Sequence, residues 1–107
     1  MMDEHDVISW NSVLSGCSCH GLGWETVELF EQMRRTGIKP NDTTFLIVLI
    51  ACSHVVLLEK GFEYLNIMKS EDFLASPRME HYATIVDLFV RTRNLREAEE
   101  FIDSLSI

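Results

Sequence analysis

The sequence predicts an all-α fold, an α-solenoid of three helix-turn-helix repeats with six antiparallel helices. One landmark is an aromatic residue followed three and four residues later by an apolar pair, at Trp10, Phe45 and Tyr82, which are 35 and 37 residues apart. A second landmark ends a short amphipathic run and has the same two spacings, at Met33, Met68 and Leu105. A repeat of this length made of two helical runs is typical of an α-solenoid, whose helix pairs bury their apolar faces on their neighbours.

The first predicted helix pair lies before Pro40. Residues 8–19 form the first helix, with apolar side chains at helical spacing: Ile8, Val13, Leu14 and Cys17. A Gly-Leu-Gly turn at residues 21–23 leads to a second helix at about 24–36, with an apolar side made of Val27, Phe30 and Met33. Gly37 ends this helix, and Pro40 prevents its continuation.

The second pair begins at residues 41–44, Asn-Asp-Thr-Thr, each of which is a possible helix cap. The helix that follows is apolar nearly all round from Phe45 to Ala51, so we expect neighbours to bury it on both sides. After a turn at residues 54–56, the fourth helix covers about 58–70, with Leu58, Phe62, Leu65 and Met68 facing inward. Residues 70–77 form a linker that ends at Pro77.

The third pair consists of helices at about 79–91 and 95–105, joined by a turn at Asn94. The last helix has an inner stripe of Ala98, Ile102 and Leu105. Residues 1–6 look like the tail of a preceding repeat, and a further helix pair would stack after Ile107. We therefore expect a piece of a longer array, whose exposed apolar ends favour self-association.

Charge and composition argue against several functions. The chain has 17 acidic and 9 basic residues, for a formal net charge of −8, which disfavours nonspecific nucleic-acid binding. The longest apolar run, Phe45 to Cys52, has 8 residues against the roughly 20 that a membrane helix needs. The acidic N-terminus has no apolar core, so a targeting peptide would lie outside these residues. We expect no membrane partner.

Metal binding and catalysis are not predicted. Three cysteines cannot form a closed disulfide set, and Cys17 and Cys52 fall on apolar helical faces, which indicates a reduced intracellular protein. Cys17, Cys19 and His20 are too few ligands for a closed metal site, and no deaminase or nucleophile pattern occurs in the chain. We expect no metal, no cofactor and no enzymatic activity.

Particular motifs resemble the pentatricopeptide repeat (PPR), whose units have about 35 residues. Residues 7–11, Val-Ile-Ser-Trp-Asn, match the start of a unit, and residues 36–41, Thr-Gly-Ile-Lys-Pro-Asn, match its end. By this resemblance the repeats cover residues 7–41, 42–78 and 79–107, the last truncated. The order of a P-like, an L-like and an S-like unit is similar to the last P-L-S triplet of plant organellar RNA-editing factors. The resemblance implies single-stranded RNA as partner, accessory editing proteins as further partners, and a mitochondrial or chloroplast location.

The turn between the two helices departs from the family pattern in two units. The family usually has Gly there, as at Gly21, but the matching positions are Val56 and Arg93. Glycine tolerates left-handed backbone angles, whereas a β-branched residue resists them. We therefore expect these two turns to be strained or differently shaped.

The resemblance also assigns base-reading residues. In the first unit, Asn11 and Asn41 would hydrogen-bond the base edge, as in pyrimidine-preferring pairs, and Ile8 and Thr43 would sandwich the base. An amide offers a donor and an acceptor together, which suits the edge of an unstacked base. The alternative is that Asn11 is a surface amide and Asn41 simply caps the next helix.

The other two units match this pattern less well. Leu46 and Arg78 are the corresponding residues of the second unit, and Ala83 that of the third. Arg91 is the best candidate for a phosphate contact, although a C-terminal cation also favours the helix dipole. Leu46 lacks a hydrogen-bonding group, so the second unit could instead dock a protein. The competing hypothesis for the whole chain is a protein-interaction solenoid similar to tetratricopeptide repeats, with little RNA affinity.

Overall fold

The computed structural model describes residues 4–70 and 77–105, and these residues form six α-helices. The helices are α1 (Glu4–Cys19), α2 (Gly23–Arg35), α3 (Asp42–His54), α4 (Leu58–Ser70), α5 (Met79–Arg91) and α6 (Leu95–Leu105). The all-α prediction is thus confirmed, and the predicted bounds of the last three helices agree with the structure. The first helix begins at Glu4, earlier than residue 8. The predicted linker at residues 70–77 lies mostly outside the described residues.

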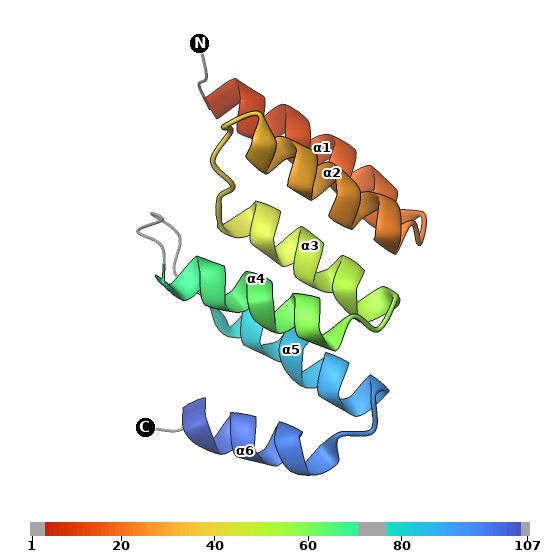
Figure 1. Cartoon of the computed structure of the whole chain (residues 1–107), viewed down its shortest axis with the longest axis vertical. Coiled ribbons are helices and arrows are strands. Elements are labelled where there is room, and N and C mark those ends of the chain that lie inside the picture. The colour runs from red at the N-terminus through yellow and green to blue at the C-terminus, as the bar shows by residue number, and fades with distance from the viewer. Residues whose placement is uncertain (1–3, 71–76, 106–107) are drawn as a thin grey trace.

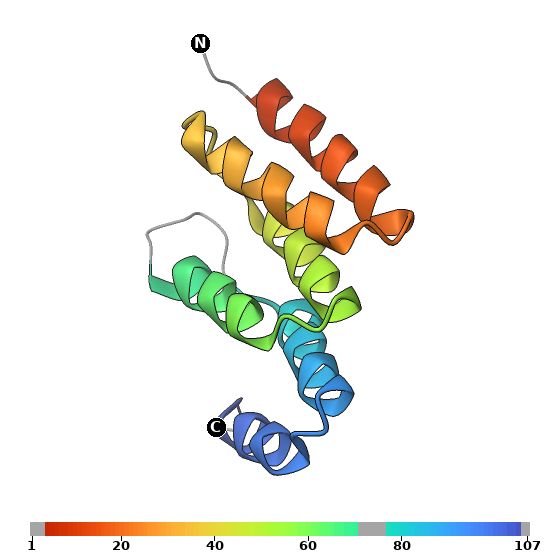
Figure 2. The same cartoon turned by 45° about the vertical axis from the view of Figure 1, so that its right-hand side comes forward.

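The helices form an elongated stack of two layers. In Figure 2, α1, α3 and α5 lie along one side and α2, α4 and α6 along the other, with the two chain ends at opposite ends of the stack. Figure 1 shows the same helices stepping in order along the long axis. The principal extents are 45 × 30 × 18 Å. We call α1, α3 and α5 the first-helix layer, because each is the first helix of its pair.

α3 is the centre of the stack. Its backbone packs against α1, α2, α4 and α5. Phe45, Val48, Leu49 and Cys52 are 0–1% exposed, as expected for a helix that is apolar nearly all round. The prediction that neighbouring helices bury α3 on both sides is confirmed.

The same C-terminal motif ends α1, α3 and α5. The backbone N–H groups of Leu22, Leu57 and Asn94 each donate to the carbonyl five residues earlier, at 2.8–2.9 Å. This is the Schellman motif, which places the preceding residue in the left-handed region. That residue is Gly21 (φ 75°) in the first pair, Val56 (φ 57°) in the second and Arg93 (φ 62°) in the third. The expectation of strain at Val56 and Arg93 is confirmed, because non-glycine residues adopt this conformation at a cost.

Close helix contact explains Gly23 at the start of α2. A Cβ atom there would lie 2.6 Å from Val55 Cγ1 and 2.9 Å from the carbonyl oxygen of Ala51. The beginning of α2 therefore approaches the end of α3 more closely than any side chain allows. This contact fixes the position of the first helix pair against the second.

On α1, Leu14 and Trp10 supply the inner face, whereas Ile8 and Val13 are 59% and 51% exposed. One expectation about inward faces is wrong, and it concerns α6. Ile102 of α6 is 45% exposed, whereas Phe101 packs among Phe62, Tyr82 and Phe89 with ring centroids 5.7–6.1 Å apart. Ala98 is buried as expected. The side chain of Leu105 lies outside the described part of the chain.

Candidate nucleic-acid interface

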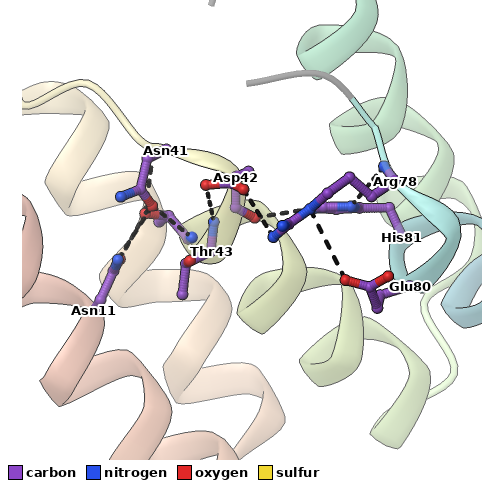
Figure 3. Close-up of polar contacts among 8 residues, drawn as sticks. Asn11, Asn41, Asp42, Thr43, Arg78, Glu80 and His81 are labelled. Carbon is purple, nitrogen blue, oxygen red and sulfur yellow. Dashed lines mark hydrogen bonds and ion pairs between the residues drawn. The ribbon is translucent and has the colours of Figure 1, made fainter. Parts of the chain in front are cut away.

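The structure brings the two predicted base-reading residues of the first unit together. Asn11 lies on α1, and Asn41 immediately precedes α3 in the neighbouring unit (Figure 3). Asn11 Nδ2 donates to Asn41 Oδ1 at 3.1 Å, across 30 residues of sequence. Asn11 is half-buried and Asn41 is exposed, so both amides lie at the surface of the first-helix layer.

Asn41 is also the N-cap of α3. Its Oδ1 accepts from the backbone N–H of Thr44 at 3.0 Å, and its own N–H donates to Thr44 Oγ1 at 3.1 Å. This reciprocal pattern is a capping box, which satisfies two N–H groups that the helix leaves unpaired. The capping alternative is therefore correct for Asn41, but it does not exclude base reading, because Asn41 Nδ2 takes no part in the cap.

Thr44 connects the cap to α1. Its Oγ1 lies within hydrogen-bonding distance of Asn11 Oδ1 and, at 2.8 Å, of Asn41 Oδ1. Thr44 is fully buried. Sequence analysis named it only as one of four possible caps and missed its contact with Asn11. The available signal was its position 33 residues after Asn11, close to one repeat length.

The two predicted base-sandwiching residues lie on the surface. Ile8 is 59% exposed and lies one helical turn before Asn11. Thr43 is exposed in the first turn of α3, and its backbone N–H donates to Asp42 Oδ1 at 3.0 Å. Both side chains are therefore accessible, and their role in sandwiching a base stays a prediction.

The corresponding position of the second unit is occupied by an ion pair. Arg78 Nη2 lies 2.7 Å from Asp42 Oδ2, and Arg78 Nε lies 3.9 Å from Glu80 Oε2 (Figure 3). Its partner position, Leu46, is half-buried and offers only apolar contact. The guanidinium thus holds the starts of α3 and α5 together, a role that sequence analysis did not find.

His81 completes this second junction. Its Nδ1 accepts from the N–H of Arg78 at 3.0 Å, and its Nε2 lies 2.9 Å from the carbonyl oxygen of Asp42. Because Nδ1 accepts, Nε2 carries the proton of a neutral ring and donates to that carbonyl. His81 therefore does for α5 what Thr44 does for α3: it caps the helix and connects it to the preceding unit.

The third unit places its candidate residues around a small cavity. Ala83 and Arg91 line a space of about 250 Å³ between α3 and α5, whose other lining residues are Ile50, Ser53, His54, Thr84 and Asp87. Arg91 Nε donates to Asp87 Oδ2 at 2.8 Å, and the Ser53 hydroxyl donates to the same oxygen at 2.6 Å. The pKa of Asp87 is lowered mainly by the hydrogen bond from Ser53 and next by that from Arg91. The carboxylate offsets much of the charge that Arg91 could offer to a phosphate.

Residues 4–70 and 77–105 contain no group of three or more His, Cys, Asp or Glu side chains placed to hold a metal ion. Among the helices described, none is long and apolar enough to span a membrane. Cys52 is buried, Cys17 is half-buried and Cys19 is exposed. Burial raises the pKa of the Cys52 thiol to about 12.

The architecture is that of an α-solenoid built from helical hairpins, with polar junctions between successive first helices. Residues 5–54 match the PPR repeat family. Over nearly its whole length the chain is also homologous to pentatricopeptide repeat-containing proteins of Arabidopsis thaliana. One of these is 46% identical over 102 residues, or 95% of this chain. A chloroplastic one is 43% identical over 104 residues (97%), and a mitochondrial one is 43% identical over 106 residues (99%).

The chain corresponds to a small part of these relatives. It covers 14% of the length of the first, 12% of the chloroplastic one and 14% of the mitochondrial one. The family match and these three relatives are described by their repeats, and none of the descriptions names an enzymatic activity.

Proposed function

We propose that this chain is a single-stranded-RNA-binding segment of a plant organellar PPR protein, and that its first unit reads one base through Asn11 and Asn41. The observation that carries this proposal is the direct contact of two surface amides from the two ends of the first unit, with Asn11 Nδ2 3.1 Å from Asn41 Oδ1. Amides on a rigid helical layer can match the edge of an unstacked base, which is how sequence-specific RNA recognition usually works. The chloroplastic and mitochondrial relatives support an organellar location.

The electrostatics favour recognition through base contacts over recognition through phosphates. Arg34, Lys60, Arg78 and Arg91 each lie within 4 Å of a carboxylate, and the chain has a net charge of −8. For a single strand, the logarithm of affinity falls with the logarithm of salt concentration by about 0.7 per neutralised phosphate. We therefore expect weak affinity with a shallow dependence on salt, and a selectivity that depends on the base.

The finer assignment is part of the same proposal. We propose that residues 7–41, 42–78 and 79–107 are P-, L- and S-type units, and that the full protein acts in RNA editing. The motif order described above supports this assignment. In such an arrangement the first unit prefers a pyrimidine.

Fluorescence anisotropy with labelled RNA oligonucleotides tests the base-reading role. Pyrimidine-rich and purine-rich strands are titrated at low and at physiological salt with wild type, Asn11→Ala and the control Asn66→Ala. Asn66 is an exposed amide on α4, in the other layer. We expect wild type and the control to prefer the pyrimidine strand and Asn11→Ala to lose the preference. The absence of binding by wild type at low salt contradicts the proposal.

A second candidate function is protein docking at the second unit. Leu46, Ile47 and Ile50 are only half-buried on α3, and the position that reads a base in the first unit is apolar here. A small accessory editing protein is the partner that the family resemblance implies. Leu46→Glu should then abolish partner capture while leaving the pyrimidine preference of the first unit unchanged. Retained capture by this variant contradicts the docking hypothesis.

A further inference from the structure

We propose that the Thr44 hydroxyl is a positioning group that, together with Asn41, fixes which way the Asn11 amide faces, so that the Asn11–Asn41 pair presents one defined pattern of donors and acceptors. This inference rests on the proposed base-reading function. It concerns a buried residue that makes no contact with the base itself, since Thr44 is fully buried beneath the two amides.

The backbone sets the orientation of Asn41, because backbone N–H groups can only donate. The N–H of Thr44 points to Asn41 at 3.0 Å, so the Asn41 atom that it meets must be the amide oxygen. The N–H of Asn41 points to Thr44 Oγ1 at 3.1 Å, so that hydroxyl accepts one hydrogen bond there. Two backbone groups thus fix the orientation of Asn41 and occupy one acceptor site of Thr44.

The orientation of the Asn11 side chain follows from that of Asn41. One Asn11 side-chain atom lies 3.1 Å from Asn41 Oδ1, and because that oxygen is an acceptor, the Asn11 atom must be the amide nitrogen. Asn41 Oδ1 then has two donors, one for each lone pair. The single hydroxyl proton of Thr44 has two oxygens in reach, Asn41 Oδ1 and Asn11 Oδ1. Because Asn41 Oδ1 is already saturated, the proton goes to Asn11 Oδ1.

The outcome is a pair with unequal faces. Asn41 keeps both Nδ2 protons and has no acceptor left, whereas Asn11 keeps one donor and one acceptor. Without the Thr44 proton, only the hydrogen bond to Asn41 Oδ1 holds the Asn11 amide in this orientation. The hydroxyl adds a second hydrogen bond at the other end of that amide, so both its nitrogen and its oxygen are held before RNA arrives, which lowers the cost of ordering on binding.

The test uses two variants of Thr44 and one matched control. Thr44→Val has nearly the same shape but lacks the hydroxyl, and Thr44→Ser restores it. Thr26→Val is the control, because Thr26 is also fully buried, lies on α2 in the other layer, and its hydroxyl donates to the carbonyl of Leu22 one turn earlier at 2.7 Å. All four proteins are first compared by thermal unfolding, and then titrated with the pyrimidine-rich and purine-rich strands.

We expect Thr44→Val to reduce the ratio of the two dissociation constants by roughly tenfold, the size of one oriented amide–base contact. Thr44→Ser should recover most of the ratio and Thr26→Val should leave it unchanged. If wild type and Thr44→Val discriminate equally well between the two strands, the inference is overturned and the proposed function stands. A wild-type protein without discrimination overturns the proposed function instead.

A measurement without RNA keeps the inference testable even if Thr44→Val folds poorly. In the wild-type protein, the side-chain amide of Asn11 should show restricted motion by ¹⁵N relaxation, in contrast to the exposed amide of Asn66. In Thr44→Ser this restriction should persist. An Asn11 amide in wild type that moves as freely as that of Asn66 shows that the hydroxyl does not orient it, and overturns the inference.

Discussion

Gly16 and Gly21 allow one substitution, Gly→Ala, to be compared in two backbone settings. An added Cβ atom would meet nothing within 4 Å at either position. Gly16 lies within α1, whereas Gly21 has φ 75° in the turn that follows. Because the chemical change is identical, its effect on the unfolded chain is the same at both sites. Any difference in stability therefore measures the folded backbone alone.

The expected signs are opposite. Gly16→Ala should stabilise the protein by roughly 0.5–1 kcal/mol, since alanine is the better residue inside a helix. At Gly21 the left-handed conformation costs alanine about 1–2 kcal/mol, which the loss of unfolded-chain entropy offsets by about 0.4–1 kcal/mol. The net result is a destabilisation of about 0.5–1 kcal/mol, and the two variants should differ by about 1–2 kcal/mol.

Urea unfolding followed by far-ultraviolet circular dichroism measures both variants against wild type. Equal m-values are required, since a changed slope would mean a changed unfolded state. Arg93→Gly is a converse control. Arg93 is exposed and its backbone has φ 62°, so glycine should relieve strain there. If both Gly→Ala variants shift stability in the same direction, the left-handed turn is not the reason that Gly21 matters.

Two further predictions concern titrating groups. An alkylating reagent at neutral pH should modify exposed Cys19 long before Cys52, because burial raises the pKa of Cys52 to about 12 and only the thiolate reacts. Peptide mapping measures the order of modification, and early modification of Cys52 contradicts the packing of α3. The pKa of Asp87 is lowered, first by the Ser53 hydrogen bond, so its stabilisation is present above the unfolded value of about 3.9 and lost as pH falls through the lower folded value. The stability difference between wild type and Asp87→Asn should be constant near neutral pH and shrink only in that acidic range, as measured by urea midpoints; a difference that is unchanged in acid refutes this assignment.

The helices could be predicted well from the sequence because helix-ending residues and the repeated landmarks mark their bounds. Pro40 and Gly37 separate the first two pairs, and the landmark spacing places the later helices even where Gly is replaced. The turn residues Val56 and Arg93 were correctly expected to be strained, since their position in the repeat matches Gly21.

Inward faces were harder to predict, because helical spacing does not say which neighbour a stripe meets. Phe101 takes the core position expected for Ile102, since three aromatic rings from α4 and α5 surround it. The polar junctions were missed for a related reason. The contact of Thr44 with Asn11 depends on how one unit stacks on the next, so only their spacing of 33 residues, and no local pattern around either residue, could have indicated it.

The central place of α3 has a consequence for how this solenoid opens. Helix pairs in such stacks are held mainly by their nearest neighbours, so separate segments can open at different free energies. Opening of α6 leaves the packing of α1, α2 and α3 intact, whereas opening of α3 removes a partner from α1, α2, α4 and α5 together. Amide hydrogens of α3 should therefore be released only when most of the described chain opens, and those of α6 well before that. The proposed base-reading residue Asn41, which caps α3, thus stands on the helix that we expect to open last.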